Sequence, residues 1–372
     1  MPPTELEIAV VGGGASGLAA AAALQEAGHK PVVFERDTQV GERWARRYDR
    51  LRLHTVRRFS GLPYHAIPRD RGRYVSKDAF AAYLRDYADR LGLDVRRGSE
   101  VLSVRPDWRI ETAGEAYDAR VVVLATGRYN EPFTPPWPGK DDYRGELLHS
   151  VEFRSGIAFA GRRVLVVGLG NTGAEIAADL VEQCAARVAV AVRTPPPVVR
   201  REILGVPVQL FGIALSPFPP KPVDRLATIL RRIGTGDLRP YGIGTAAWGP
   251  FSARRPAVID VGFLAQLKAR RIDVRGEVTR LTAAGAVFAD GEEEPFDAVI
   301  AATGFTRGLE RFLEAPGALD ERGEPIRAED GSGAYPGLFF SGYTETVRGQ
   351  LLEAKKLAPK LAAAVTRYLS AL

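Results

Sequence analysis

The apolar residues of this chain form short runs that alternate with longer segments of helical character. Near the N-terminus, the run Ile8–Val11 is followed by a glycine-rich turn, an alanine-rich segment at Leu18–Ala27 and a second run at Pro31–Phe34. Short apolar runs next to turn residues are typical of buried strands, and Gly28 suits a helix C-cap. The pattern therefore predicts strand, helix and strand, the opening of an α/β fold.

The turn after the first strand reads Gly12-Gly13-Gly14-Ala15-Ser16-Gly17. Gly12 permits a tight turn, Gly14 lets the backbone approach a pyrophosphate, and Gly17 lets helix and strand pack closely. The helix N-terminus offers unpaired N–H groups to the phosphates. Glu35 ends the second strand, where its carboxylate accepts hydrogen bonds from ribose hydroxyls. This unit predicts a dinucleotide site, and the alternative is an empty structural turn.

A second copy of this unit starts near Arg162. Val164–Val167 is a predicted strand, Gly168-Leu169-Gly170-Asn171-Thr172-Gly173 is the loop, Ala174–Glu182 is the helix, and Arg187–Val192 is the next strand. This last strand ends in Arg193 where the first copy has an acid. A guanidinium binds a 2′-phosphate that a carboxylate would repel. The alternative is that Arg193 is one more solvated arginine.

Two further strands share the ending Ala-Thr-Gly. Arg120–Leu124 runs into Ala125-Thr126-Gly127, and Ala298–Ala301 runs into Ala302-Thr303-Gly304. Small residues there let the backbone pass close to a ligand or reverse between domains. One domain's worth of sequence lies between the second glycine loop and the second Ala-Thr-Gly. We therefore expect two Rossmann-like dinucleotide-binding domains, one inserted into the other: residues 1–157 and 301–372 form the split domain and residues 158–300 the inserted one.

The C-terminal part completes the split domain. Gly337–Ser341 is a predicted strand followed by Gly342, and Gly349-Gln350 opens a long helical segment that Pro359 is expected to kink or restart. The N-terminus of such a helix faces the bound dinucleotide. The alternative is that this helix serves packing only.

Two other segments carry less information. Ser76–Leu91 predicts a capped amphipathic helix whose aromatic residues face the core. Residues 195–256 form a Pro/Gly-rich insertion with one predicted helix, Asp224–Ile233. A substrate channel, a dimer surface and a patch that contacts a membrane all fit this insertion, and the sequence does not separate them.

Composition excludes several classes of function. The 372 residues are 45% hydrophobic and 26% charged, as in ordinary globular proteins of two or three domains. The single cysteine, Cys184, excludes a disulfide scaffold and a redox dithiol, and four scattered histidines predict no metal site. The net charge of +6 comes without a dense basic run, so we expect no nucleic-acid partner. No signal peptide or transmembrane span is predicted, which indicates a cytoplasmic protein.

One site with an acid and one with an arginine suggest FAD paired with NADPH. The chemistry would be hydride transfer to a flavin, with the protein supplying binding and orientation. The inserted domain would hold NADPH and the split domain FAD. Since a redox dithiol is excluded, the electron acceptor is oxygen, a quinone or another protein.

The segment before the second glycine loop carries a further motif. Tyr143, Gly145, His149 and Phe153 have the spacing F-x-G-x-x-x-H-x-x-x-[Y/F], which resembles the identifying motif of flavin-containing monooxygenases, with Tyr143 in place of phenylalanine. The related Baeyer–Villiger motif is absent. Within the family, the chain is most similar to the YUCCA-type branch and its bacterial relatives, over nearly its whole length. The segments that carry this similarity are Tyr48–His54, Leu62-Pro63, Gly168–Gly173, Val192-Arg193-Thr194, Arg201–Gly205 and Ala302–Phe305.

This resemblance implies an enzyme in which NADPH reduces FAD and a C4a-hydroperoxyflavin oxygenates a small organic substrate. The residues expected around FAD are Gly12, Gly14, Ala15, Ser16, Gly17, Glu35, Arg36, Arg43, Trp44, His54, Thr126, Gly127, Gly342 and Gln350. Those expected around NADPH are Gly168, Gly170, Asn171, Thr172, Gly173, Arg193, Thr194 and Arg201, with Thr303 and Gly304 also counted as cofactor contacts. No catalytic side chain is assigned, and a homodimer stays open.

One departure from the family keeps alternatives open. Many members place an asparagine beside the flavin, whereas this chain has only Asn130 and Asn171, neither of them in the stretch around His54–Pro63. An NADPH oxidase that releases hydrogen peroxide is one alternative. A nucleotide-binding module that senses redox state without catalysis is another, which the completeness of both loops disfavours.

The YUCCA-type branch implies oxidative decarboxylation of an aryl 2-oxo acid such as indole-3-pyruvate. Such an anion needs a cation, for which the sequence offers Arg43, Arg57, Arg58 and Arg201 without ranking them. An aromatic wall has its candidates in the insertion, Phe211, Phe218, Tyr241 and Trp248, which serve equally well as packing residues. The competing substrates are amines and sulfides.

Overall fold

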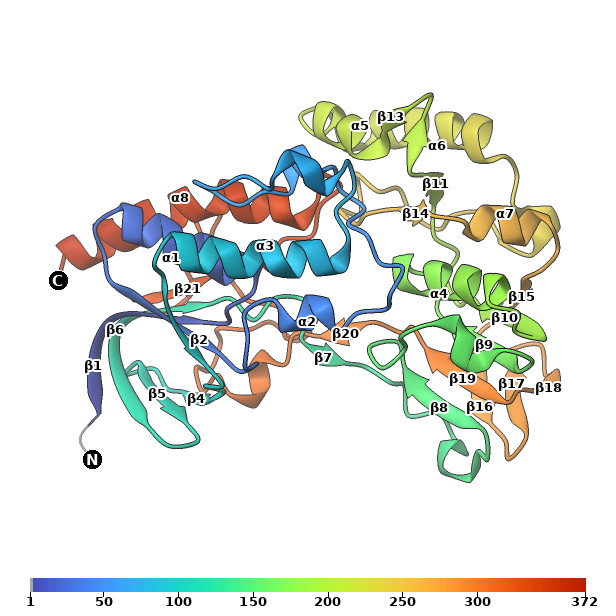
Figure 1. The fold of residues 1–372 in the computed structure, drawn as a ribbon, viewed down its shortest axis with the longest axis horizontal. Coiled ribbons are helices and arrows are strands. Elements are labelled where there is room, and N and C mark those ends of the chain that lie inside the picture. The colour runs from blue at the N-terminus through green and yellow to red at the C-terminus, as the bar shows by residue number, and fades with distance from the viewer. Residues whose placement is uncertain (1–2) are drawn as a thin grey trace.

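The molecule has two lobes, each built around a β-sheet (Figure 1). The computed structural model describes residues 3–372. The first sheet has a parallel core and is extended at one edge by a β-hairpin. In spatial order its strands are β3 (Asp94–Arg97), β2 (Pro31–Glu35), β1 (Thr4–Val11), β6 (Ala116–Leu124), β5 (Arg109–Thr112) and β4 (Val101–Val104), with β21 (Leu338–Phe340) also paired to β6.

The second sheet is parallel throughout. Its spatial order is β15 (Asp273–Arg275), β10 (Arg187–Ala191), β9 (Arg163–Val167), β19 (Ala298–Ala301) and β8 (Glu146–His149). Strand β8 belongs to this sheet although it precedes the boundary expected at residue 157. The exact domain boundaries stay a prediction.

The remaining strands form small sheets, and the helices cover the two large ones. The small sheets are β11 (Val198–Arg200) with β14 (Val258–Asp260), β12 (Glu202–Ile203) with β13 (Val206–Pro207), β16 (Val278–Leu281) with β17 (Gly285–Phe288) and β18 (Glu293–Pro295), and β20 (Phe305–Thr306) with β7 (Glu131–Pro132). The helices are α1 (Ala15–Glu26), α2 (Glu42–Ala45), α3 (Lys77–Arg90), α4 (Asn171–Glu182), α5 (Val208–Leu215), α6 (Pro220–Thr235), α7 (Phe263–Lys268) and α8 (Gln350–Ser370).

Alternating side chains of the central strands fill two cores in each lobe. In β1, Ile8 and Val10 face the core shared with helices α1, α3 and α8, while Ala9 and Val11 face the opposite side. In β9, Val164 and Val166 face α4 and α7, whereas Leu165 and Val167 face the three-stranded sheet β16–β18. Both faces of each sheet are covered, which explains why these strands read as continuous apolar runs.

Helices α1 and α8 pack side by side across the first sheet (Figure 1). Small alanines on α1 allow the close approach, and His29 Nε2 lies 2.8 Å from Thr366 Oγ1 where the two helices end. Helix α8 continues through Pro359 without a break, so of the two expected effects, a kink or a restart, the restart does not occur and the kink stays a prediction. Proline removes only the hydrogen bond to the carbonyl of Lys355, whose residue is exposed, and the buried Leu357 and Leu361 hold both halves of α8 on the core.

The expected aromatic helix is confirmed as α3. The Ser76 side chain accepts a hydrogen bond from the backbone N–H of Ala79, and Phe80, Tyr83 and Tyr87 are buried. In the insertion, α6 extends the predicted helix at both ends, and α5 is a second helix that the sequence did not predict. Across residues 3–372, no helix combines the length and the apolar character needed to cross a membrane.

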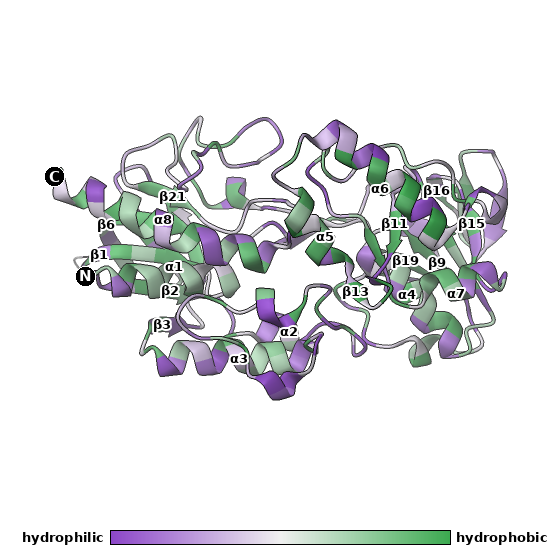
Figure 2. Ribbon diagram, turned by 90° about the horizontal axis from the view of Figure 1, so that it is seen from above, coloured by the Kyte–Doolittle hydropathy of each residue, from purple (hydrophilic) through white to green (hydrophobic). Residues whose placement is uncertain are grey.

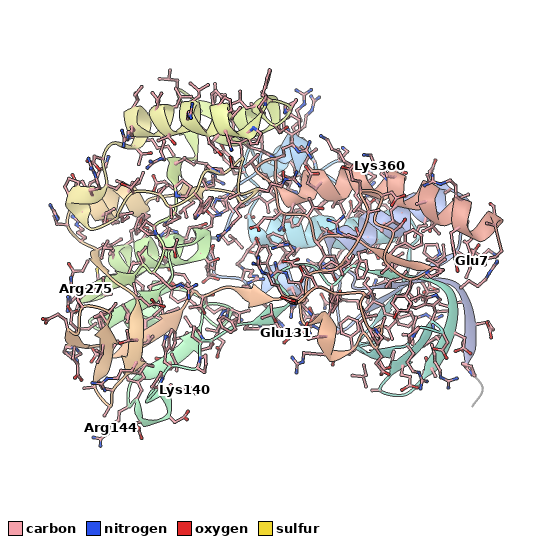
Figure 3. The ribbon with its side chains drawn as sticks, turned by 180° about the vertical axis from the view of Figure 1, so that it is seen from behind. Glu7, Glu131, Lys140, Arg144, Arg275 and Lys360 are labelled. Atoms are coloured by element: carbon pink, nitrogen blue, oxygen red, sulfur yellow. The ribbon has the colours of Figure 1, made fainter. Side chains whose placement is uncertain are left out.

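Leu361 tests the packing of α8 on α1. Its side chain is fully buried in the core that both helices share, so Leu361→Ala is expected to lower the free energy of unfolding by about 2–5 kcal/mol. Lys360→Ala is the matched control, because the neighbouring Lys360 is exposed and projects outward in Figure 3. Urea unfolding followed by circular dichroism measures both, and equal midpoints would contradict the packing described here.

Candidate functional site

A cavity of about 1210 Å³ lies between the two lobes and is lined by both glycine-rich loops. It brings together most of the residues expected around cofactors. Those that line it are Gly12, Gly14, Ala15, Ser16, Glu35, Arg36, Arg43, Trp44, His54, Thr126, Gly127, Gly168, Gly170, Asn171, Thr172, Arg193, Thr194, Thr303, Gly304, Gly342 and Gln350. Gly17, Gly173 and Arg201 are not part of its wall.

The first loop is held by close backbone packing. Gly12 has φ +109°, and a Cβ atom there would lie 2.8 Å from the carbonyl oxygen of Ala125. A Cβ atom on Gly17 would lie 1.8 Å from the carbonyl oxygen of Gly12. Gly17 therefore acts through helix–strand contact and not through the ligand, as its place outside the cavity wall also indicates.

The second loop repeats this geometry. Gly168 has φ +105° and would place a Cβ atom 2.6 Å from the carbonyl oxygen of Ala302, while Gly173 would place one 2.0 Å from the carbonyl oxygen of Gly168. Each loop thus packs against the Ala-Thr-Gly ending of the neighbouring strand. The two Ala-Thr-Gly segments found in the sequence are the backbone supports of the two loops.

The middle glycine of each loop faces open space. A Cβ atom on Gly14 or Gly170 would meet no atom of residues 3–372 within 4 Å. Both glycines are N-caps without a side-chain cap, of α1 and α4 respectively, and neither helix has an acid in its first turn. Free N–H groups and positive dipole ends therefore point at the cavity from both lobes, which fits the pyrophosphates of two dinucleotides.

Glu35 lies at the end of β2, as the first loop requires. Its Oε2 accepts a hydrogen bond from the backbone N–H of Gly13 at 2.8 Å, and its Oε1 accepts one from Asp37 at 2.9 Å. Burial raises the pKa of the Glu35 carboxyl above its ordinary value. Each carboxylate oxygen has a further lone pair, so the group retains acceptors for the hydroxyls of a ribose.

The two arginines expected at the second site have different surroundings. Arg193 follows β10, lines the cavity and is 76% exposed, with Nη1 3.8 Å from Glu277 Oε1. The guanidinium of Arg201 instead lies 3.5 Å from the ring centre of Tyr74 and donates a hydrogen bond from Nη2 to the carbonyl of Leu53. Arg193 therefore faces the cavity with only a long ion-pair contact to Glu277, whereas Arg201 is engaged by the first lobe.

Three residues of the first lobe approach the cavity from the segment around α2. Arg36 Nη1 donates to Glu131 Oε1 at 3.3 Å, and Arg43 Nη1 donates to the carbonyl of Asn130 at 2.9 Å. Trp44 packs edge-on against Phe80, with ring centres 4.7 Å apart. Arg43 and Trp44 thus line the cavity while being held by the protein itself.

Two polar atoms in the wall of the cavity are buried without a partner. Within the described part of the chain, Gln350 Nε2 and His54 Nδ1 have no hydrogen-bond partner, and both residues line the cavity. Gln350 is the first residue of α8. Buried polar atoms are normally satisfied, so these two atoms fit hydrogen bonds to a bound flavin.

Thr126 and Gly342 close the same side of the cavity. Thr126 Oγ1 lies 2.8 Å from the hydroxyl of Tyr343, a buried residue whose pKa burial raises to about 12. Gly342 has φ +88°, and a Cβ atom there would lie 2.6 Å from Ser16 Oγ. The strand ends of β6 and β21 are thereby fixed against the first glycine loop.

A polar cluster that the sequence analysis missed joins the lobes beside His54. His54 Nε2 lies 2.8 Å from Oε1 of Glu175, which belongs to α4 of the second lobe and is 2% exposed. Tyr48 also lines the cavity, and burial, followed by the Glu175 carboxylate, raises its pKa well above its ordinary value. In the sequence, the one sign of this cluster was an acidic residue, Glu175, two positions after the second glycine loop.

The motif around His149 has a structural role in this molecule. The N–H of Val151 donates to His149 Nδ1 at 3.2 Å, so Nε2 carries the proton and donates to the carbonyl of Gly304 at 3.0 Å. Burial lowers the pKa of His149, which favours this neutral form. The imidazole therefore ties β8 to the Ala-Thr-Gly ending of β19, where the second loop is supported.

The flanking motif residues pack around this tie. A Cβ atom on Gly145 would lie 2.2 Å from the hydroxyl of Tyr143, which itself donates to the carbonyl of Phe296 at 2.9 Å. Phe153 is fully buried against Phe159. The hydroxyl of Tyr143, which stands where the motif has phenylalanine, therefore has a hydrogen-bond partner within the protein.

Both asparagines line the cavity, but their amides have partners in the protein. Asn130 Nδ2 donates to the carbonyl of Arg307 at 3.2 Å, and Asn171 Oδ1 accepts from the N–H of Ile259 at 2.6 Å. Both amides are therefore held by the protein, and neither asparagine belongs to the segment around His54–Pro63.

Only some of the cations and aromatic residues considered for substrate binding line the large cavity. Arg43 lines the large cavity, whereas Arg57 and Arg58 line a different one. Of the four aromatic candidates, Trp248 alone lines the large cavity among the described residues. Two stacked pairs in its wall were not foreseen: Arg47 lies 5.2 Å from the ring centre of Phe305, and Arg255 lies 4.8 Å from that of Trp248.

A family model and known proteins match this chain. The model described as pyridine nucleotide-disulphide oxidoreductase matches residues 9–202, just over half of the chain. The rice protein indole-3-pyruvate monooxygenase YUCCA1 (Oryza sativa subsp. japonica) is 38% identical over 327 residues, which are 84% of this chain and 80% of that protein.

Two solved structures share the fold. A flavin-containing monooxygenase from Stenotrophomonas maltophilia superposes with a TM-score of 0.77 at 24% identity and covers 98% of this chain and 99% of its own. The structure of OTEMO in complex with FAD and NADP gives a TM-score of 0.75 at 18% identity, covering 98% and 85%.

Substitutions at Gly14 and Gly17 are expected to have different effects, the first on FAD binding and the second on stability. Gly14→Ala is expected to leave the thermal unfolding midpoint of the cofactor-free protein unchanged and to weaken FAD binding about tenfold or more, because its methyl group fills space that only the ligand uses. Gly17→Ala is expected to lower that midpoint, because its methyl group collides with Gly12. Thermal unfolding and FAD fluorescence titration check both variants, and a destabilised Gly14→Ala protein with normal FAD affinity would reverse the assignment.

Proposed function

Because the chain belongs to the pyridine nucleotide-disulphide oxidoreductase family and, within it, to the flavin-dependent monooxygenases of the YUCCA type, we propose that it oxygenates an aryl 2-oxo acid such as indole-3-pyruvate. It is a flavoprotein monooxygenase that uses FAD, NADPH and dioxygen. Its single cysteine, Cys184, excludes a redox-active pair of cysteines within the chain.

One observation supports this function most strongly: two helix N-termini, each capped by a glycine with open space above it, face the same cavity from different lobes. Two dinucleotides bound there would approach one another inside it. Hydride transfer needs this proximity, because the reacting atoms must come within van der Waals contact.

We assign FAD to the first lobe and NADPH to the second. The chain of the first lobe is interrupted, since β21 near the C-terminus pairs with β6, while the second sheet uses strands between residues 146 and 301. This supports a nicotinamide-binding domain inserted into a split flavin-binding domain.

The protein's own groups then bind and orient the cofactors. The N-termini of α1 and α4 bind the two pyrophosphates, Glu35 accepts hydrogen bonds from the flavin nucleotide's ribose, and Arg193 binds the 2′-phosphate. Gln350 Nε2 and His54 Nδ1 supply hydrogen bonds toward the flavin, with Glu175 orienting the imidazole of His54. When bound, the flavin supplies the hydride acceptance and oxygen activation that no side chain offers.

The wall of the cavity suits an aromatic anion. Burial lowers the pKa of Arg47, and its guanidinium lies over Phe305. Trp248 and Arg255 form a second cation–aromatic pair in the same wall. We propose that one of these arginines binds the substrate carboxylate while an aromatic ring packs against the aryl group. The cytoplasmic location and the homodimer stay predictions.

Arg193 is expected to set the preference for NADPH over NADH. A hydrogen bond to a charged group contributes about 1.5–3 kcal/mol, so Arg193→Gln should raise the KM for NADPH about tenfold to a hundredfold and leave the KM for NADH nearly unchanged. Steady-state rates of flavin reduction with each nucleotide measure this.

Arg200→Gln is the matched control for Arg193. Arg200 is exposed and lies outside the cavity wall, so its loss should change neither KM. An equal rise in both KM values for Arg193→Gln would show that the phosphate is bound elsewhere.

Coupling measurements test the substrate. We expect indole-3-pyruvate and phenylpyruvate to be converted to the acids shortened by one carbon, with about one product formed for each NADPH consumed. A tertiary amine and a thioether should increase peroxide release and yield little oxygenated product. The measurement compares NADPH consumed, product formed and hydrogen peroxide released.

Two results would separate the alternatives. Coupled turnover of the amine or thioether, with only peroxide from both oxo acids, would disprove decarboxylation while leaving a monooxygenase. Peroxide release with every compound would identify an NADPH oxidase.

A further inference from the structure

Helix α6 carries an apolar stripe on its outer surface. Leu226, Ile229, Leu230 and Ile233 are 46%, 57%, 38% and 80% exposed. Their spacing of three and four residues places them on one face of the helix. The side of α6 that packs on the protein is marked by the buried Val223 and Thr235 and by the partly buried Ala227 and Arg231, and the stripe begins at the edge of that side next to Val223. In an amphipathic helix of a globular protein the apolar face is normally the buried one, so this stripe lacks its usual covering.

Cations run along one flank of the stripe. Lys221, Arg225 and Arg232 are exposed, and their spacing of four and seven residues aligns them on a second strip of the same helix. Asp224 is the single acid in the sequence of α6, and its carboxylate accepts the backbone N–H groups of Phe251 and Ser252 at 2.9 and 2.8 Å. The outer surface of α6 is therefore apolar and positively charged, with its one acid already engaged by the protein.

Neighbouring segments of the insertion expose further apolar side chains. Phe218, just before α6, is 57% exposed, and Leu204, in the turn between β12 and β13, is 100% exposed. Helix α5, strand β13 and α6 form the upper edge of the molecule in Figure 1, away from both large sheets. Figure 2 shows that α6 combines hydrophobic and hydrophilic residues along its length. The apolar side chains thus come from α6 and from its two neighbours in the same insertion.

We propose that this edge binds the surface of a lipid bilayer with anionic headgroups. The stripe of α6, with Phe218 and Leu204, would enter the boundary between headgroups and acyl chains, and Lys221, Arg225 and Arg232 would contact the lipid phosphates. Long cationic side chains suit that position because their stems stay in apolar surroundings while their charged ends reach the headgroups.

Charge decides between a bilayer and a second copy of the chain. Pairing two α6 stripes around a two-fold axis brings the Arg225 end of one helix beside the Arg232 end of the other. The sequence of α6 offers no free acid to compensate these like charges. An anionic lipid surface has the charge that the helix lacks, so it is the better partner.

The contact would lie next to the cavity. Asp224 connects α6 to the turn at Phe251 and Ser252, and that turn follows Trp248 and precedes Arg255, both in the cavity wall. The proposed surface is therefore linked to the binding site but contains none of the residues assigned to FAD, NADPH or the substrate.

Vesicle flotation of the FAD-loaded protein tests the proposal. Vesicles of phosphatidylcholine alone are compared with vesicles that also contain phosphatidylglycerol. We expect at least about tenfold stronger binding to the anionic vesicles, and this preference should fall steeply as salt is added. The double variant Ile229→Gln/Ile233→Gln should lose about tenfold or more of the binding to both. Arg225→Gln/Arg232→Gln should remove mainly the preference for anionic lipid.

Matched controls keep the outcome clear. Ile157→Gln/Ile326→Gln removes two other exposed isoleucines, 67% and 48% exposed, and should leave vesicle binding unchanged. Lys360→Gln, at an exposed position of α8 away from α6, is the control for charge. All variants should retain bound FAD and NADPH-dependent flavin reduction, so this test stands apart from the proposed catalytic function.

Two results would overturn the proposal. The first is wild-type protein that floats with neither kind of vesicle. The second is light scattering that shows a dimer which Ile229→Gln/Ile233→Gln converts to a monomer, because the stripe would then be a surface between two copies of the chain.

Discussion

The close packing of each glycine loop against the end of a neighbouring strand is the constraint on which the rest of this molecule depends. Gly12 and Gly168 have positive φ and lie almost in contact with the carbonyl groups of Ala125 and Ala302. A side chain at either position would push the loop away from its sheet. The helix that follows would then be displaced, and its free N–H groups would no longer point at the cavity. The direction of both helix N-termini therefore depends on the close approach of Gly12 to Ala125 and of Gly168 to Ala302.

Around these supports, a few polar contacts fix the second lobe internally and join it to the first. His149, held in its neutral form, ties β8 to Gly304, and His54 of the first lobe meets the buried Glu175 of the second. Glu131 of β7 accepts hydrogen bonds from Arg36 and Arg311, at the junction between the lobes seen in Figure 3. A cavity shared by two dinucleotides needs such fixed geometry, because small displacements between reacting groups cost much of the rate.

Several features were predictable because they depend on neighbours in the sequence. The central strands β1, β2, β6, β9, β10, β19 and β21, the two loops and the aromatic helix α3 follow from local apolar patterns, caps and turn residues. The helix α5 was missed because its run of apolar residues lacks a polar face and a capping residue. Of the kink or restart expected at Pro359, the restart does not occur because packing of Leu357 and Leu361 outweighs one lost hydrogen bond.

The sequence by itself determined the two dinucleotide units, the acid at Glu35 and the arginine at 193, since these lie within short segments whose backbone geometry is local. Only the tertiary structure decided which side chains from distant segments meet. It directed Arg201 to Tyr74 and Leu53, brought Glu175 to His54, and paired Arg47 with Phe305 and Arg255 with Trp248. It also left the apolar face of α6 exposed, where the same pattern would have been satisfied by a buried helix. Such contacts depend on how the lobes pack, and packing is set by many weak interactions that no single stretch of sequence contains.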